Sequence, residues 1–544
     1  MKKSYRVLLP FLLVCLVPLA ARAQSFRVQC PTSTVTHPSA LTNVNAEPAY
    51  TGPTALSTAS ATTYQAPTGN VNGAIKCQQI SGGDGYSTMG DGTQTYMFSF
   101  GPLSGLADIA HGLPGTQFPI VFNTVYTGAF PLQPGAPATA ATPSNGGSLA
   151  SGFGNYNGAI GLATNLDAQA AGICGNAGQP SCLDGHVDPR PIIEVGVMNG
   201  NIPAPLFAID EDDEFFLTLT NVGMIMRPDL FEQHTVHFHG YPNASTFYDG
   251  VPDASVAINI GGSFTYYYLA PDAGTYFWHC HITPPEHLQM GMVGQLYVRP
   301  RQNRVASGSS LYDALVAQQG DNRTKCDSTQ DILCSNPLPF GAAAGSAPRA
   351  AAGNYAYNDG DGSTHYDVEY PLQIHGFDPN FHFVGMTFNP EEFNDMKDKY
   401  FLLNGRSYPD TVTAGPLATQ SSDSKMHFSQ PLPSIINIPA GGRALLRISD
   451  LDVTEYQTLA SLGIPMTVIG YNAKLLRDQA GNNLYYNTNS ITLAGGESLD
   501  VILDATNTAL YPSGSVFYLY TPNLDHLSND AENFGGLMTE VHIN

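Results

Sequence analysis

Short apolar runs rich in aromatic and β-branched residues recur along two long stretches of the chain, and Gly, Pro, Asn and Asp separate them. Runs of this kind favour antiparallel strands that pack into a β-sandwich. In the first stretch we predict strands at 95–100, 191–195, 214–220, 235–238, 263–268, 274–278 and 294–298.

The second stretch begins near Tyr366 and continues to Asn544 with the same pattern. It predicts strands at 370–374, 400–403, 435–438, 443–448, 466–469, 498–503 and 516–520. No repeat of short period is visible, which disfavours a solenoid or a propeller. The pattern therefore predicts an all-β protein with two β-sandwich domains of similar size and long loops.

Shifts in composition set the predicted domain boundaries. Residues 24–73 are rich in Thr, Ala, Ser, Pro and Asn, which is typical of a poorly ordered arm. The first domain is predicted at 74–300, with a loop insertion at 101–190, and the second at 363–544. Between the two domains, residues 301–362 include an Ala- and Gly-rich piece that suits a linker.

The N-terminus has the features of a cleaved secretory signal at residues 1–23. It begins with basic residues, continues with an apolar run from Val7 to Ala21, and ends in the small-residue site Ala21-Arg22-Ala23. The apolar run is too short for a comfortable membrane span. We therefore expect a periplasmic or secreted protein without a membrane span.

Composition and charge narrow the classes of function. High contents of Gly, Pro, Tyr and Phe accompany only 12% charged residues, which suits strands and turns. The formal net charge is −23, and loss of the signal, with its four basic residues and no acids, makes it −27. Such a field repels nucleic acid and anionic membranes and could attract metal cations or a basic redox partner. Simple solubility is the alternative reading.

Cysteine usage leaves one thiol over. Removal of Cys15 with the signal leaves seven cysteines, and an odd number in an oxidising compartment suggests disulfides plus one thiol kept for chemistry. Proximity along the chain suggests the pairs Cys174 with Cys182, Cys326 with Cys334, and Cys30 with Cys77. Cys280 is then the free thiol.

Cys280 lies inside a concentration of histidines. Two segments hold six of the fifteen histidines: His234, His237 and His239 in the first, and His279, His281 and His287 in the second. A blue, type 1 copper site needs one thiolate, two imidazoles and a weak axial thioether. We predict that His234, Cys280, His287 and Met292 bind one such copper.

The remaining four histidines form a second candidate group. Side chains alternate along a strand, so His279 and His281 should point away from the Cys280 side, while His237 and His239 point together. These four imidazoles could bind another metal, which Cys280 would connect to the type 1 copper through covalent bonds. Zinc binding or ordinary hydrogen-bonded histidines are the alternatives, but the nearby methionine and the flanking histidines favour copper.

The same residues resemble the copper motifs of multicopper oxidases and their cupredoxin relatives. The motifs are His-x-x-His-x-His-Gly at 234–240 and His-Cys-His at 279–281, and the resemblance covers about 191–300. It implies two cupredoxin-like Greek-key domains, with copper as the cofactor. In the first domain it implies the type 1 ligands named above, His237 as a type 2 ligand and His239, His279 and His281 as type 3 ligands. The second domain resembles a copper-free cupredoxin domain more weakly.

One departure from the oxidase motif concerns the loop after His-Cys-His. Five residues, 282–286, precede His287, where the usual motif has three. This longer loop is similar to that of copper nitrite reductases, which carry a type 1 site in the first of two domains and form trimers. His237, however, stands where those reductases have a catalytic Asp.

A second departure concerns the number of histidines. The oxidases bind a trinuclear copper cluster through eight histidines, and no further His-x-His pair exists in this chain. We predict His375 and His382 as the best candidates for ligands supplied by a neighbouring subunit. The resemblance implies a homotrimer with His237, His239, His279 and His281 at or near the interface.

The leading functional hypothesis is a copper-dependent oxidase in which Cys280, His279 and His281 carry electrons towards oxygen. The reductant could be a phenol, a metal ion or a redox protein. A type 1 electron-transfer protein, a nitrite reductase-like enzyme and a metal-storage protein are the alternatives.

Overall fold

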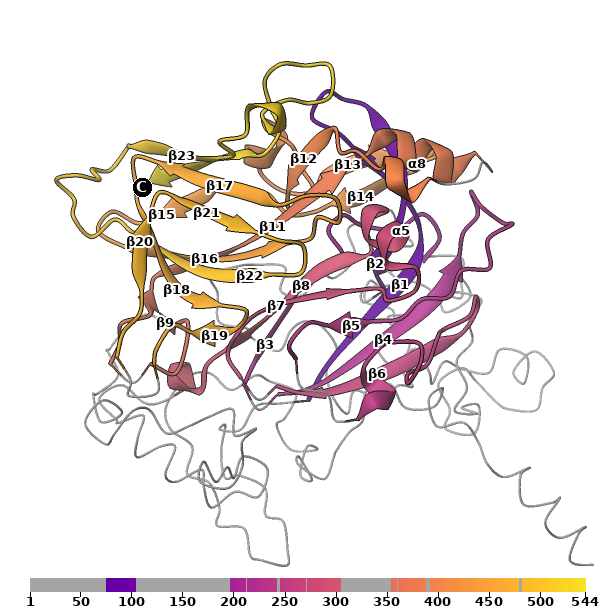
Figure 1. Cartoon of the computed structure of the whole chain (residues 1–544), viewed down its shortest axis with the longest axis horizontal. Coiled ribbons are helices and arrows are strands. Elements are labelled where there is room, and N and C mark those ends of the chain that lie inside the picture. Colours follow the sequence, from indigo (N-terminus) through magenta and orange to yellow (C-terminus); the bar gives the residue numbers. More distant parts are fainter. Residues whose placement is uncertain are drawn as a thin grey trace, which may run out of the picture.

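The computed structural model describes residues 75–103, 196–304 and 354–544, apart from 212, 242–244, 271, 360, 388–391 and 479–481. The predicted signal and arm, most of the insertion and linker, and the proposed disulfides lie outside the described side chains. Two β-sandwiches lie side by side in Figure 1.

The first sandwich contains two four-stranded sheets. The order of one sheet is β2 (Gln94–Pro102), β1 (Ile75–Thr88), β4 (Glu214–Gly223) and β6 (Ser263–Leu269). The order of the other is β3 (Phe207–Asp210), β8 (Val293–Arg299), β7 (Gly274–His279) and β5 (His237–Phe238). An aromatic core holds the two sheets together, and in it Phe207 stacks on Trp278 with ring centroids 4.8 Å apart.

The second sandwich is larger but is built in the same way. One sheet has the order β12 (Tyr400–Leu403), β11 (Val368–Phe377), β16 (Arg443–Asp450), β22 (Ser498–Asp504), β18 (Met466–Tyr471) and β19 (Lys474–Leu475), and β20 (Tyr486–Thr488) pairs with β18. The other has the order β15 (Ile436–Ile438), β24 (Met538–Ile543), β23 (Val516–Tyr520), β17 (Gln457–Leu462) and β21 (Ser490–Leu493). Its core is mainly aliphatic, with residues such as Leu446, Val468 and Leu503 fully buried.

The elements outside the two sandwiches are short. Two hairpins pair β9 (Asn354–Tyr355) with β10 (His365–Tyr366), and β13 (Leu417–Gln420) with β14 (Met426–Gln430). Within the described ranges, the complete helices are α5 (Pro284–Gln289) and α8 (Pro379–Met386). The 3-10 turns there are η7 (Thr246–Tyr248), η8 (Arg301–Arg304), η9 (Phe393–Asp395), η10 (Asp410–Val412) and η11 (Leu524–His526). The prediction of an all-β fold is confirmed.

Two predicted elements differ in extent from the structure. Residues 235–238 were predicted as one strand, but only the two residues of β5 pair regularly, and His234 forms an isolated bridge with Ile258. Within the predicted linker, 354–359 already pack against the second domain, where Tyr355 and Tyr357 are buried. In both places long-range contacts, rather than local pattern, decide the structure.

The two sandwiches share one topology. In each, the first strand pairs in parallel with the fourth (β1 with β4, and β11 with β16), and a later pair is also parallel (β3 with β8, and β15 with β24). The sheet order β2-β1-β4-β6 therefore matches β12-β11-β16-β22, and β3-β8-β7-β5 matches β15-β24-β23-β17. The chain repeats one Greek-key frame twice.

Sheet β3-β8-β7-β5 of the first domain packs against β11, β16 and β22 of the second through polar contacts. Gln295 on β8 donates to the backbone oxygen of Arg447 at 2.9 Å. Thr275 on β7 donates to Asp500 at 2.6 Å. Because these groups are buried, the interface depends on completed hydrogen bonds as well as on apolar contact.

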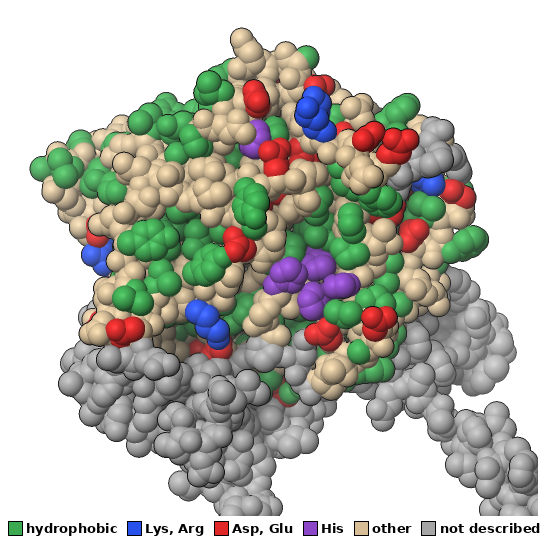
Figure 2. All heavy atoms as spheres, viewed as in Figure 1, with side chains coloured by type: hydrophobic (Ala, Val, Ile, Leu, Met, Phe, Trp, Pro, Cys, Tyr) green, Lys and Arg blue, Asp and Glu red, His purple; other side chains and the backbone are tan. Residues whose placement is uncertain are grey.

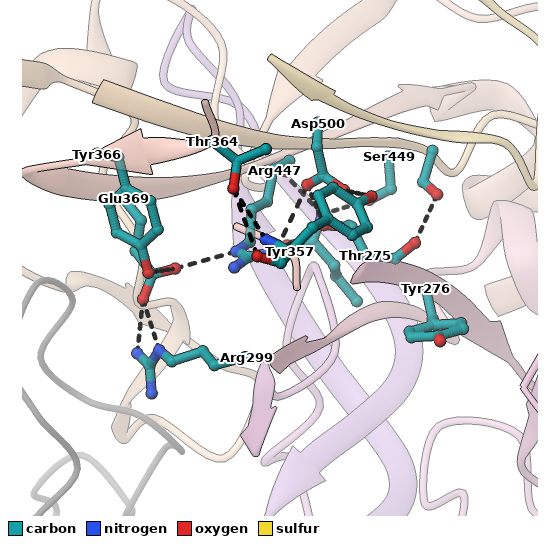
Figure 3. Close-up of polar contacts among 12 residues, drawn as sticks. Thr275, Tyr276, Arg299, Tyr357, Thr364, Tyr366, Glu369, Arg447, Ser449 and Asp500 are labelled. Carbon is teal, nitrogen blue, oxygen red and sulfur yellow. Dashed lines mark hydrogen bonds and ion pairs between the residues drawn. The ribbon is translucent and has the colours of Figure 1, made fainter. Parts of the chain in front are cut away.

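A buried ionic network lies at this interface (Figure 3). The carboxylate of Glu369 contacts Arg299 at 2.7 Å and Arg447 at 3.0 Å, and Arg447 also reaches Asp500 at 3.5 Å. Burial by itself would raise the pKa of Glu369, but the two guanidinium groups hold it below its usual value. Glu369 therefore stays ionised and neutralises charges from both domains.

We predict that Glu369→Gln destabilises the protein by about 3–5 kcal/mol, because it leaves two buried guanidinium groups without their shared carboxylate. Chemical denaturation monitored by tyrosine fluorescence measures the change. Glu392→Gln on the exposed turn before η9 is the matched control and should change the unfolding free energy by less than about 0.5 kcal/mol. Equal stability of the two variants would contradict the role given to Glu369.

Candidate metal centre

Three predicted type 1 ligands converge in the interior of the first domain. His234 precedes β5, Cys280 follows β7, and His287 lies in α5; all three are fully buried. The Cys280 sulfur lies 3.3 Å from Nδ1 of His287 and 4.0 Å from Nδ1 of His234. One donor atom from each residue lies within 4.8 Å of the other two.

The loop after Cys280 folds back on itself because of α5. Two residues, Ile282 and Thr283, lead from His281 into this helix, which begins with two prolines, where a missing N–H costs little. After the helix, the N–H of Met292 donates to the His287 carbonyl at 2.8 Å, and the N–H of Cys280 donates to the Met292 carbonyl at 3.1 Å. Met292 is thereby fixed beside Cys280 and is fully buried.

The donor chemistry of this group fits a soft cation. The Cys280 sulfur accepts the Thr235 N–H at 3.4 Å, and Nε2 of His287 faces the Glu232 carboxylate at 3.4 Å. Burial by itself lowers the pKa of His287, but Cys280 and Glu232 raise it to about 10. The surroundings of this imidazole therefore favour positive charge. Two imidazoles and one sulfur, in a loop that also carries the buried thioether residue Met292, are donors that copper prefers.

A second group of imidazoles lies at the surface on the other side of β7. His237 pairs with His279 across β5 and β7, and ligand nitrogens of His237, His239 and His279 lie within 4.8 Å of one another. The His281 ring is 5.1 Å from that of His237 and 5.4 Å from that of His279. Figure 2 shows histidines gathered on one face of the molecule. We call His237, His239, His279 and His281 the surface histidine cluster.

Two members of the surface histidine cluster, His239 and His279, lie in surroundings that favour neutral rings. Burial and the neighbouring His237 lower the pKa of His239 to about 4, and burial together with His239 lowers that of His279 well below its usual value. Neutral imidazoles keep a lone pair for a metal ion. His239 Nε2 lies 2.9 Å from His279 Nε2, so these two nitrogens already point at one place.

Comparisons with known proteins agree with these motifs. The family model described as multicopper oxidase matches residues 185–303. The matched segment contains both histidine motifs and Cys280. Among curated proteins, the laccase abr2 of Aspergillus fumigatus is 34% identical over 122 residues, which are 22% of this chain and 19% of that protein. The multicopper oxidase MmcO of Mycobacterium tuberculosis is 34% identical over 92 residues, 17% of each chain.

Solved structures overlap with more of the chain at lower similarity. The blue copper oxidase from Nitrosomonas europaea is 21% identical with a TM-score of 0.41, covering 63% of this chain and 78% of that one. The copper nitrite reductase from Nitrosomonas europaea is 15% identical with a TM-score of 0.36, covering 64% and 85%. The matches span about a fifth or less of the length of the curated relatives.

The prediction that His375 and His382 serve a neighbouring subunit is wrong. Both are buried in the interdomain interface. His375 Nε2 lies 2.9 Å from the Leu288 carbonyl, and His382 lies 2.6 Å from the carbonyl of Tyr96 and 2.9 Å from that of Gln289. Burial lowers the pKa of His382 to about 3, although both carbonyl contacts act to raise it. Both histidines brace the end of α5 from the second domain.

The second domain also borders the surface histidine cluster. A cavity of about 460 Å³ lies between the domains and is lined by residues that include His239, Leu288, Asp452, Glu455 and Gly496. The Gly496 carbonyl lies 3.3 Å from His239 Nδ1, and Gly496 has a φ of +89°. A side chain at Gly496 would be strained and its Cβ would lie 2.8 Å from the imidazole, so glycine is required there.

Sequence reasoning missed several residues near these two groups. Glu232 contacts His287 although its only signal in the sequence is its position two residues before His234. Asp398 accepts a hydrogen bond from Gln289 at 3.0 Å and also hydrogen-bonds to Thr454 and Asp452. Nothing local marks these carboxyl groups, because their partners lie far away in the chain.

The carboxyl groups of Asp398 and Asp452 converge over Gly376, where an added Cβ would lie 2.1 Å and 2.6 Å from their Oδ2 atoms. Burial and the charge of Asp452 raise the pKa of Asp398 well above its usual 3.8. Between the unfolded and the folded pKa the folded state binds more protons, so stability should fall as pH rises through this range. Each excess proton contributes about 1.4 kcal/mol per pH unit.

We predict that Asp398→Asn reduces the loss of stability with rising pH, because the asparagine amide can donate to Asp452 without a titratable proton. Thermal unfolding between about pH 5 and pH 8 should show a shallower decline than in the wild type. Asp395→Asn, on the exposed turn η9, is the control and should follow the wild type. An unchanged slope for Asp398→Asn would show that the pair does not share a proton.

Proposed function

We propose that this chain is an exported copper-dependent oxidase that takes single electrons from a reductant and passes them to oxygen. The observation that carries the proposal is the position of Cys280, whose side chain lies among His234 and His287 while its chain neighbours His279 and His281 join the surface histidine cluster. Only a few covalent bonds separate the two groups.

His234, Cys280, His287 and Met292 would hold a type 1 copper, which supplies one-electron redox chemistry when bound. Burial of these side chains excludes water and limits changes in geometry when charge changes. The path from the Cys280 sulfur to the His279 ring has a hydrogen-bonded branch, because His279 Nδ1 lies 2.6 Å from the Cys280 carbonyl. These contacts support electron transfer from the interior to the surface histidine cluster.

The surface histidine cluster would hold the second copper centre, at which oxygen is reduced. Its four imidazoles come from β5, β7 and the residues beside them, so a rigid sheet edge positions them. The reductant would approach near Glu232, whose carboxylate is 22% exposed and touches His287. An acid there suits a metal cation or a phenol that loses a proton, although a redox protein is an alternative donor.

A type 1 electron-transfer protein is the second candidate. The described residues offer only four histidines at the surface cluster, which is fewer than the trinuclear site of the oxidases requires. A nitrite reductase-like activity has less support, because His237 occupies the position of that family's catalytic Asp. The predicted N-terminal signal supports export, and no helix in the described ranges is long and apolar enough to cross a membrane.

We predict that Cys280→Ser abolishes the intense blue absorption of the copper-loaded protein and leaves its circular dichroism unchanged. The colour requires a copper–thiolate bond, and serine preserves the shape of the side chain. Copper analysis and electron paramagnetic resonance on the wild type separate the candidates: about four coppers per chain with a type 2 signal indicate the oxidase, and a single blue copper indicates the carrier. Retained colour in the variant would refute the ligand assignment.

We further predict a homotrimer with the surface histidine cluster at or near the subunit interface. The cluster is short of ligands for an oxygen-reducing site, and cyclic symmetry would bring another surface against each copy. Light scattering combined with copper analysis on one sample tests this. A monomer with full copper content would contradict the assembly, and a trimer with one copper per chain would retain the assembly and favour the carrier.

A further inference from the structure

The repeated frame of the two domains allows each residue of the buried first site to be matched in the second domain. In the first domain β5 pairs with β7 through His237 and His279, and Cys280 follows directly. In the second domain β17 pairs with β23 through Ala460 and Tyr520. Thr521 therefore occupies the position of Cys280, and Gln457, three residues before Ala460, that of His234.

The loops after these positions share two backbone hydrogen bonds. The N–H of Cys280 donates to the Met292 carbonyl at 3.1 Å, and the N–H of Thr521 donates to the Leu537 carbonyl at 2.9 Å. The N–H of Met292 donates to the backbone carbonyl of His287 at 2.8 Å, and the N–H of Leu537 donates to the backbone carbonyl of His526 at 3.0 Å. His526 thus occupies the position of His287, and Leu537 that of Met292, although the second loop is longer.

A carboxylate beside the imidazole is repeated as well. Glu232 lies two residues before His234, and its oxygen is 3.4 Å from Nε2 of His287. Glu455 lies two residues before Gln457, and its oxygen is 3.3 Å from Nε2 of His526. The two domains therefore correspond in the backbone hydrogen bonds of the loop, in one histidine, and in the acidic residue that faces Nε2 of this histidine.

We propose that the second domain retains the frame of a second type 1 copper site, in which three of the four ligand positions are occupied by Gln457, Thr521 and Leu537. Only the imidazole of His526 remains. Its Nδ1, the atom that in His287 faces the Cys280 sulfur, lies 3.1 Å from Oε1 of Gln457. A glutamine–histidine hydrogen bond thus replaces the bonds to a metal ion, and this domain binds no type 1 copper itself.

Three substitutions should restore a site for copper: Gln457→His, Thr521→Cys and Leu537→Met. The exchange of leucine for methionine nearly preserves volume, and cysteine is close in size to threonine. Asp452 accepts a hydrogen bond from Nε2 of Gln457 at 2.6 Å and can accept one from Nε2 of a histidine there. That hydrogen bond would leave Nδ1 of the new histidine to face the metal. Hydrogen bonds to the outer nitrogen commonly orient ligand histidines in this way.

The test uses the full chain with Cys280→Ser as background, because this inference rests on the ligand assignment in the proposed function. If the wild type is blue and the background variant is colourless, that assignment holds. Adding the three substitutions should then restore an intense blue absorption and one type 1 copper per chain. The control carries Gln457→His, Thr521→Ser and Leu537→Met, lacks the thiolate and should stay colourless. A folded triple variant that binds no blue copper would overturn the proposal.

A blue background variant would instead refute the proposed function before the second domain is considered. If the triple variant does not fold, the milder pair Thr521→Cys and Leu537→Met is titrated with Co(II), using His526 and the new thiolate. The expected result is a thiolate-to-cobalt absorption that is absent from the Cys280→Ser background. No such absorption in the folded pair would also contradict a retained ligand frame.

Discussion

The pairing of β7 with β5 and β8 fixes the direction of every side chain in the His-Cys-His segment. Alternation along the strand points Cys280 into the sandwich and its two neighbours outward. Cys280 can then meet His234 and His287 in the interior while His279 and His281 meet His237 at the surface. A shift of one residue in this register would exchange the two environments and would destroy both groups of donors.

The second domain supports this arrangement from outside. His375 and His382 contact carbonyls at the end of α5, Gly496 contacts His239, and the Glu369 network locks the two sheets together. The interface is polar and its central carboxylate and guanidinium groups are paired, which makes its geometry specific, since a displaced partner would leave a charge buried and unpaired. The second domain therefore positions the residues of both donor groups. Among the described residues, it contributes no donor atom to either group.

The same Greek-key frame carries different side chains at corresponding positions in the two domains. In the first domain it brings the Cys280 thiol together with the imidazoles of His234 and His287, and Met292 is buried in the same loop. In the second domain it brings Gln457 to His526, with Thr521 and Leu537 at the corresponding positions. The backbone hydrogen bonds that shape the loop are alike in both, so the frame is independent of the metal chemistry. Side chains at four positions decide whether the site can bind a soft cation or is closed by a hydrogen bond.

The sequence by itself determined the all-β class, the two strand-rich blocks and the grouping of six histidines around Cys280. These features are local: the period of a strand and the spacing within a motif are visible over a few residues. Tertiary structure alone decided that His375 and His382 are buried braces, that Glu232 faces His287, and that Asp398 meets Asp452. Each depends on partners distant in the chain, and no local pattern shows which buried polar groups will satisfy one another.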